Sequence, residues 1–417
     1  MTLLDDRPSS VDSQVKLRRV RTLVTIVLIG TVASIAFHYV GTFWRGWGYP
    51  RSTFLFRPED HLNDWNNTYR YAQALLHGRP APVIYFPFAF VVTGAATLLP
   101  MAVGLVLMVV LFLVALVLIL RRWVVDLEGD ALVRLQYVLI LVVLSYPVLF
   151  ALDRANHELL IFVFLAGFLY FLYVRKPAWL AALFLAAAIA YKLYPAVFLL
   201  LLLAERRIRL FVVTILVALA LTAAGVALLM LRGVFGLLQL VHMNSHEKTV
   251  YQQIQVVAQG GIQHGHSLWG LLQVPRLVGS TTPSALQMNG YTVLSAILFL
   301  VIALHVVFRE QERWKQVYLV TMAALVLPFV SVDYTLIQVY FPLVFFLNSP
   351  RVSRWDLTYV ILFAVLLIPV DYRYLSLAHD GISVSVLVYP SVLVLLALLA
   401  VFDHAPRPMG LDKGTMG

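Results

Sequence analysis

The chain has 417 residues, of which 61% are hydrophobic and 12% are charged; it has no cysteine and a formal net charge of +10. Such hydrophobicity excludes an ordinary soluble domain, and the lack of cysteine excludes disulfides, thiolate catalysis and cysteine-bound metal. The basic residues stand in short clusters between apolar runs. This pattern is typical of the cytoplasmic loops of membrane proteins and argues against nucleic acid as a partner.

Apolar runs of bilayer-crossing length recur along the chain and predict an all-α polytopic membrane protein. The runs are hydrophobic on all sides, unlike the alternating strands of a membrane β-barrel. They lie near residues 20–40, 84–120, 134–152, 158–174, 178–204, 210–231, 291–308, 316–332, 335–348, 356–370 and 384–402. We expect a bundle of about 10–12 transmembrane helices.

The first apolar run has no signal-peptide cleavage site after it and is predicted to be a retained span. With the N-terminus inside, every basic cluster falls on the cytoplasmic side under two conditions. The 84–120 region crosses once in net terms, and the 178–204 region forms a hairpin with its YKLYP tip outside. We predict one membrane domain over residues 20–402, with long outer loops at 41–83 and 232–290. Cytoplasmic tails are predicted at 1–19 and 403–417.

The first outer loop contains the polar and aromatic stretch DWNNTYRYAQALLHGRP at residues 64–80. The spacing of its apolar residues predicts a short amphipathic helix at the outer membrane surface, which ends near Gly78. Two interpretations of Asp64 are open. It is either a helix cap, or a general base at the hydrophobic boundary.

This stretch, followed by YFPF from Tyr85, resembles the first outer loop of glycosyltransferase family 87. Four further motifs keep the order of the family: RAN at 154–156, KLYP at 192–195, GHSLWG at 265–270 and SVDYT at 331–335. The resemblance covers roughly residues 20–350. The chain departs from the family pattern at Phe88, which replaces a proline, and at Tyr334 and Thr335, which stand where the family often has two histidines.

The resemblance implies a GT-C-like bundle whose first outer loop is catalytic. It also implies transfer of a hexose, by default mannose, from a polyprenyl-phosphate sugar to a lipid or glycan hydroxyl, with inversion. The reaction would take place on the extracytoplasmic side of the plasma membrane, among membrane lipids, and no cofactor is expected. Asp64 is the implied base; one carboxylate suffices because phosphate leaves unprotonated, unlike the leaving group of glycoside hydrolysis.

Lys192 stands inside an apolar run, where a cation is costly unless it is paired or faces a cavity. It either snorkels, pairs with Asp153 or Glu158, or binds the donor phosphate with help from Arg154. The full set of substrate-binding candidates comprises Tyr85, Arg154, Asn156, Lys192, Tyr194, His266, Ser267, Asp333 and Tyr334.

For Asp333 an interfacial cap and a contact to sugar hydroxyls, with Tyr334 stacked on the ring, are both open. Four histidines in the second outer loop form no closed ligand set, and no metal is expected; they are His242, His246, His264 and His266. A competing function is a transporter or lipid flippase, which favours internal repeats that this chain lacks. A non-catalytic scaffold is a third possibility, and it predicts that replacing Asp64 is harmless.

Overall fold

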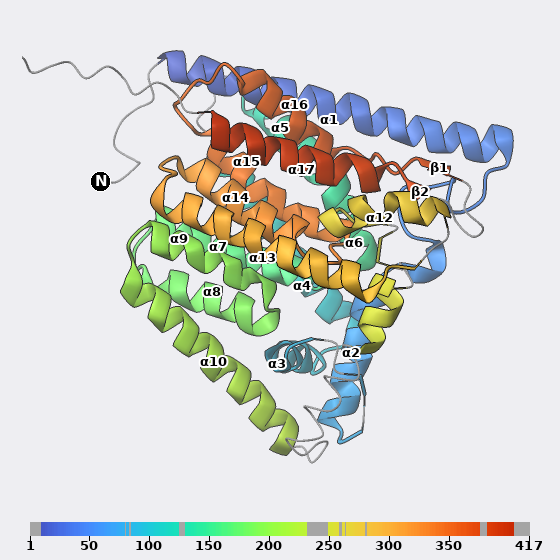
Figure 1. Ribbon diagram of the computed structural model, residues 1–417, viewed down its shortest axis with the longest axis vertical. Coiled ribbons are helices and arrows are strands. Elements are labelled where there is room, and N and C mark those ends of the chain that lie inside the picture. Colours follow the sequence, from blue (N-terminus) through green and yellow to red (C-terminus); the bar gives the residue numbers. More distant parts are fainter. Residues whose placement is uncertain are drawn as a thin grey trace, which may run out of the picture.

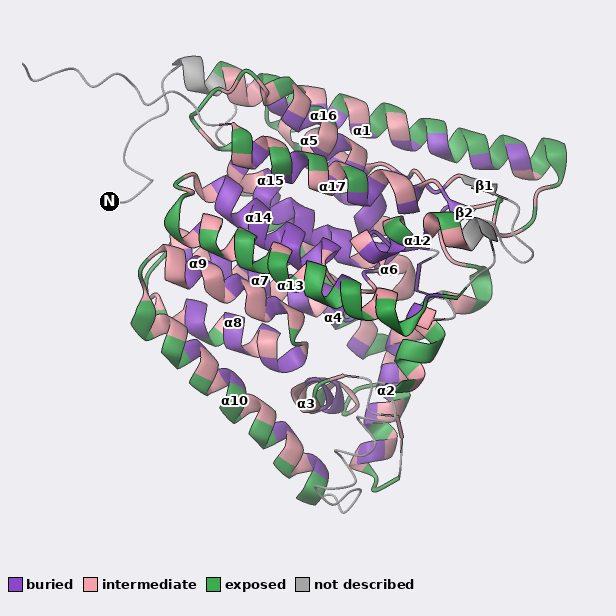
Figure 2. Cartoon of the chain, in the orientation of Figure 1, coloured by how far each residue is buried: buried purple, intermediate pink, exposed green. Residues whose placement is uncertain are grey.

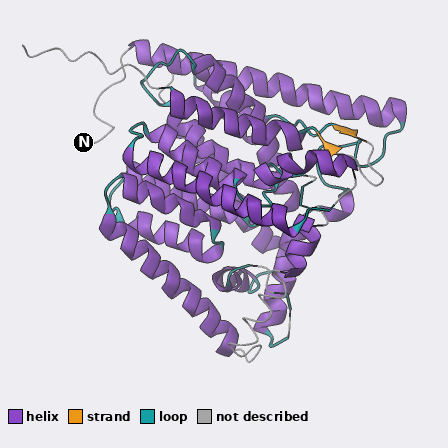
Figure 3. Ribbon diagram, in the orientation of Figure 1, coloured by secondary structure: helices purple, strands orange, loops and turns teal. Residues whose placement is uncertain are grey.

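The computed structural model describes residues 10–79, 81–82, 85–124, 130–231, 249–257, 261–262, 264–279, 282–375 and 382–403. Apart from loops and one short two-stranded ribbon, this part of the chain is helical (Figure 3). The described α-helices are α1 (Ser10–Arg45), α2 (Asn63–Leu76), α3 (Pro87–Ala96), α4 (Met101–Val124), α5 (Ala131–Val143), α6 (Tyr146–Arg154), α7 (Glu158–Tyr173), α8 (Trp179–Tyr191), α9 (Leu199–Ala204), α10 (Ile208–Leu231), α12 (Leu268–Gly279), α13 (Ala285–Phe308), α14 (Arg313–Val326), α15 (Tyr340–Leu347), α16 (Asp356–Leu367) and α17 (Ser385–Phe402).

Short segments of other types complete the described chain. Three are 3-10 helices, η1 (Pro58–Asp60), η2 (Tyr194–Phe198) and η4 (Asp333–Val339), and η3 (Gln252–Val257) is a π-helix. The strands β1 (Arg373–Leu375) and β2 (Ile382–Ser383) pair antiparallel with an irregular register. They lie in the segment between α16 and α17.

Five described helices, α1, α4, α10, α13 and α17, are long and apolar enough to cross a membrane. The pair α5 and α6 makes a sixth span if its 50° bend, just before Pro147, is counted as a break within one crossing. The all-α polytopic class is therefore confirmed. The expected 10–12 crossings are reached only if most of the six shorter apolar helices in the described chain also cross.

The helices surround a buried centre. Every residue of α14 from Trp314 to Val326 is buried, because α15, α17, α13 and η2 pack around it (Figure 1). In contrast, α13 is exposed along most of its length, and α10 and α1 also show wide exposed faces (Figure 2). A helix that is apolar on all sides and exposed in the isolated chain fits a position against lipid.

Two segments depart from simple spans as the sequence predicts. The Pro87–Pro100 region forms the separate ten-residue helix α3, which is seen nearly end-on in Figure 1 while α10 runs across the view. Helix α8 ends at Tyr191, Lys192 has extended backbone, and the chain continues into η2, which packs against α8 and α14.

Gly225 allows α10 to pack against the start of α3. A Cβ atom at this position would lie 2.6 Å from the backbone carbon of Pro87 and 2.7 Å from the amide nitrogen of Phe88. Because backbone cannot rotate away, we expect Gly225→Ala to destabilise the protein by about 1–3 kcal/mol through overpacking. The measurement is the thermal unfolding midpoint in detergent. Gly290→Ala is the matched control, since a Cβ there meets nothing within 4 Å; an equal effect of both changes would contradict the packing argument.

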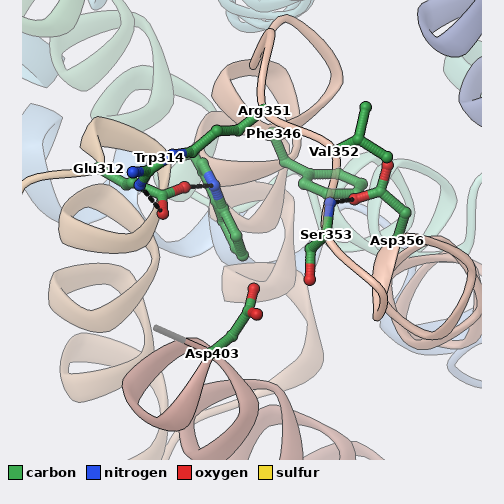
Figure 4. A pocket seen from close by; sticks show the side chains of 8 residues that line it. All are labelled: Glu312, Trp314, Phe346, Arg351, Val352, Ser353, Asp356 and Asp403. Carbon is green, nitrogen blue, oxygen red and sulfur yellow. Dashed lines mark hydrogen bonds and ion pairs between the residues drawn. The ribbon is translucent and has the colours of Figure 1, made fainter. Parts of the chain in front are cut away.

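Polar side chains around a pocket at one end of the bundle connect α1 to α16 and to the segment before it. Arg19 is buried and donates to Asp356 at 2.8 Å through Nε and to the Ser349 carbonyl at 2.7 Å. The residues in Figure 4 line the pocket beside this ion pair: Glu312, Trp314, Phe346, Arg351, Val352, Ser353, Asp356 and Asp403. The charges pair within the protein, as in the 2.6 Å bond from Arg351 to Glu312, which gives this pocket a structural role.

Candidate active site

Asp64 lies in the first turn of α2 but does not cap it. The N-cap is Leu62, with a φ of +58° and no side-chain cap hydrogen bond, so the helix-cap interpretation is wrong. Instead, Asn156 donates from Nδ2 to Oδ2 of Asp64 at 2.6 Å, and Arg154 pairs with Oδ1. The side chain of Asp64 is 17% exposed. Its carboxylate is therefore oriented by two donors while part of it stays accessible.

The apolar face of α2 packs against protein. Trp65 is buried and donates from Nε1 to the carbonyl of Met101 at 3.1 Å, and Tyr69 donates to the carbonyl of Leu99 at 2.6 Å. Both acceptors lie at the corner between α3 and α4. Gly104 gives the Trp65 ring its room, since a Cβ there would lie 2.9 Å from the ring.

Asn156 connects Asp64 to the start of α7. It follows Ala155, which ends α6 in the left-handed region with a φ of +48°. The Asn156 amide nitrogen donates to Asp64, while its Oδ1 accepts the backbone N–H of Glu158 at 2.9 Å. One amide side chain therefore satisfies an orphan donor of α7 and fixes the carboxylate at the same time.

Arg154 and Asp153 hold the preceding loop over this corner. Arg154 donates from Nη1 to the carbonyl of Asp60 at 3.2 Å, and its guanidinium lies 4.4 Å from the centre of the Phe56 ring. Asp153 accepts the backbone N–H of Phe56 at 3.1 Å and pairs with His61. The RAN corner thus fixes both the loop and the first turn of α2.

Lys192 pairs with Glu158, one of the two partners that the sequence analysis left open. Its Nζ donates to Oε1 at 2.5 Å, and Tyr194 donates to Oε2 at 2.5 Å. Glu158 is fully buried, whereas the Lys192 side chain is 32% exposed. Arg154, expected to assist Lys192, contacts Asp64 instead, so the two cations have separate carboxylate partners.

A cluster of aromatic side chains lies beside these two ion pairs. His157, in the corner between α6 and α7, lies with its ring 5.0 Å from that of Tyr85 and 5.9 Å from that of Trp65. Burial, with a contribution from nearby Lys192, lowers the pKa of His157 to about 3, so it is neutral at pH 7. His157 was not among the predicted site residues, and its position directly after the RAN motif is the one sequence signal that points to it.

Tyr85 links the two halves of the site. Burial raises its pKa well above the ordinary value, with further contributions from Asp64 and Glu158, so the phenol stays protonated. The hydroxyl of Tyr334 also lies within electrostatic range of Asp64, Tyr85 and Glu158. Asp64, Tyr85, Tyr334 and the Glu158–Lys192 pair therefore lie near one another.

His266, Ser267 and Asp333, three of the predicted substrate contacts, lie together in a buried cluster. Asp333 accepts hydrogen bonds from Tyr146 at 2.8 Å and pairs with Nδ1 of His266 at 3.0 Å, and both residues are fully buried. Ser267 donates to the carbonyl of Phe329 at 2.9 Å. These groups use their hydrogen-bonding capacity within the protein. Asp333 is therefore not an interfacial cap.

Within the described ranges, no group of three or more histidine and carboxylate side chains is arranged to hold a metal ion. His264 lies 3.5 Å from Asp371. His242 and His246 lie outside the described residues.

The fold and this site define a polytopic helical membrane protein with a charged and aromatic site at one end of its bundle. Residues 84–332, more than half of the chain, match the model of glycosyltransferase family 87. The chain belongs to this family and is a membrane glycosyltransferase. No curated protein and no solved structure matches it. The matched region includes Tyr85 and the RAN and KLYP motifs but begins after Asp64, so the case for that residue depends on its geometry.

Proposed function

We propose that the enzyme transfers a hexose, by default mannose, from a polyprenyl-phosphate sugar to a hydroxyl group of a lipid or glycan. The observation that carries the proposal is the geometry of Asp64. Its carboxylate is fixed by Arg154 and Asn156 and is partly accessible. Tyr85 lies within electrostatic range of both Asp64 and Glu158, and Glu158 is the partner of the partly exposed Lys192. A base must be held within reach of the proton that it takes, and an oriented, partly accessible carboxylate supports this role for Asp64.

In the proposed reaction, Asp64 takes the proton of the acceptor hydroxyl as its oxygen attacks the anomeric carbon. The bond from that carbon to the phosphate oxygen breaks, and polyprenyl phosphate leaves with the electron pair. Attack opposite the leaving group inverts the anomeric configuration. Lys192 stabilises the negative charge that grows on the phosphate as the bond breaks. This interaction is stronger in the transition state than in the bound donor, so it raises the rate.

Tyr85, Tyr194 and Tyr334 line the proposed sugar site. Tyrosine combines an apolar ring, which suits the C–H face of a hexose, with a hydroxyl for the sugar oxygens. The proposed orientation places this site outside the cytoplasm, because Arg19, Arg351 and the other groups of the opposite polar end belong to the basic clusters that favour the inner side. The proposed location is the plasma membrane.

The test is transfer by the purified protein in lipid nanodiscs. Labelled polyprenyl-phosphate mannose, glucose and arabinose are offered separately with a lipid extract. We expect label to move from one donor into an extractable product, with release of polyprenyl phosphate. Should no donor give a product while the protein moves labelled donor across a vesicle bilayer, the flippase interpretation replaces the proposal.

A further inference from the structure

Glu158 is a fully buried carboxylate that the proposed chemistry does not use directly. It occupies the first position of α7, where the helix dipole favours negative charge. Lys192 and Tyr194 donate to its two oxygens at 2.5 Å, and Gln338 adds a bond of 3.3 Å. A buried carboxylate is costly unless its partners satisfy it fully, and here three elements of the fold supply them.

Lys192 itself has little else to fix it. It lies at the break between α8 and η2, where its extended backbone leaves the helix ladder. An ammonium has three N–H donors, and within the described chain Glu158 accepts one of them while Tyr194 lies beneath at 5.3 Å. The side chain is one-third exposed, so its remaining donors are available to a ligand.

We infer that Glu158 is a positioning residue that holds the ammonium of Lys192 in place for the phosphate group of the lipid-linked donor. This inference rests on the proposed function, because it takes Lys192 as the phosphate contact. Its physical basis is asymmetric burial: the carboxylate is fixed on the protein side, so the cation is directed to the open side. A flexible lysine without this anchor would lose side-chain entropy each time it bound a phosphate.

A double-mutant cycle tests this directly, using Glu158→Gln, Lys192→Met and the combined variant of the full-length protein. Because charged hydrogen bonds are involved, we expect E158Q to lower kcat/KM for the donor about 10-fold and K192M about 50-fold. In the K192M background, E158Q should change kcat/KM by less than about 2-fold, since the glutamine oxygen can still accept from Tyr194 and the lost charge acts through Lys192. KM for the acceptor should stay within about 2-fold throughout, because Glu158 does not contact it.

Folding is controlled in two ways. The combined variant removes both charges, so neither ion is left buried alone, and its thermal midpoint should exceed that of K192M. Asp356→Asn weakens the ion pair with the buried Arg19 at the opposite end of the bundle and is the matched control. It should lower the thermal midpoint without changing kcat/KM for the donor.

Two results would overturn the inference: an equal loss from E158Q in both backgrounds, or a loss from D356N as large as that from E158Q. The same cycle measured as binding of polyprenyl phosphate to an Asp64→Asn background needs no turnover. If the effects of E158Q and K192M on binding depend on each other but the wild-type protein transfers no sugar, the role of Glu158 stands and the proposed function is rejected. If the wild-type protein transfers sugar but the two substitutions affect binding independently, the proposed function stands and the role of Glu158 is rejected.

Discussion

Replacing Asp64 with asparagine is expected to lower kcat for sugar transfer by about 10³-fold, within the range that a general base contributes. Asparagine keeps the size of the side chain and can still accept from Asn156, but it cannot take a proton from the acceptor. The measurement is initial rate with saturating donor and acceptor, together with the thermal midpoint. Because Arg154 keeps its bond to the Asp60 carbonyl and its contact with the Phe56 ring, we expect the midpoint to fall only slightly.

Asp60→Asn is the matched control for this change. Asp60 lies four residues earlier in the same loop, and its carboxylate pairs with Arg57 at 3.3 Å on the surface. Its backbone carbonyl still accepts from Arg154 in the variant. Transfer should therefore remain within about 2-fold of the wild type, as for most surface substitutions. Full activity in D64N, or equal losses in D64N and D60N, would remove Asp64 from the catalytic role.

The position of α2 could be predicted from the sequence because its signals are local. The apolar residues recur at helical spacing, and Gly78, with a φ of +71°, follows the helix end as expected for a left-handed stop. The partners of Asp64 could not be derived in this way. Arg154 and Asn156 are 90 and 92 residues away in sequence, and only the packing of α6 against α2 brings them together.

Whether Trp65 contacts lipid or protein could not be predicted from the sequence either. A tryptophan on the apolar face of an outer helix is equally suited to lipid and to protein contact, and its sequence environment does not distinguish the two. The contact with Gly104 decides it, and that glycine lies in a run that predicts only a span. The number of crossings is undecided for a related reason. Breaks such as the one before Pro147 divide apolar runs into helices too short to assign by length.

Replacing Asp333 is expected to give the largest loss of stability, and it decides between the structural role and the sugar contact. Its carboxylate joins Tyr146 of α6 to His266 in the segment before α12, and its backbone N–H donates to the carbonyl of His264 at 2.9 Å. Asp333→Ala leaves the Tyr146 hydroxyl and Nδ1 of His266 without their carboxylate partner. We expect a loss of about 3–5 kcal/mol, measured as the unfolding midpoint in denaturant.

Milder variants separate stability from substrate binding, since D333A could leave too little folded protein to assay. Tyr146→Phe removes one donor and should cost about 1–2 kcal/mol, and Asp333→Asn should fall between the two. In both, the folded fraction should keep the donor KM of the wild type, because the Asp333 carboxylate is fully buried and interacts with protein groups. An unchanged midpoint in D333N combined with a raised donor KM would instead mean that Asp333 contacts the sugar. That outcome would require η4 to move away from α6, which packs on it closely in this structure.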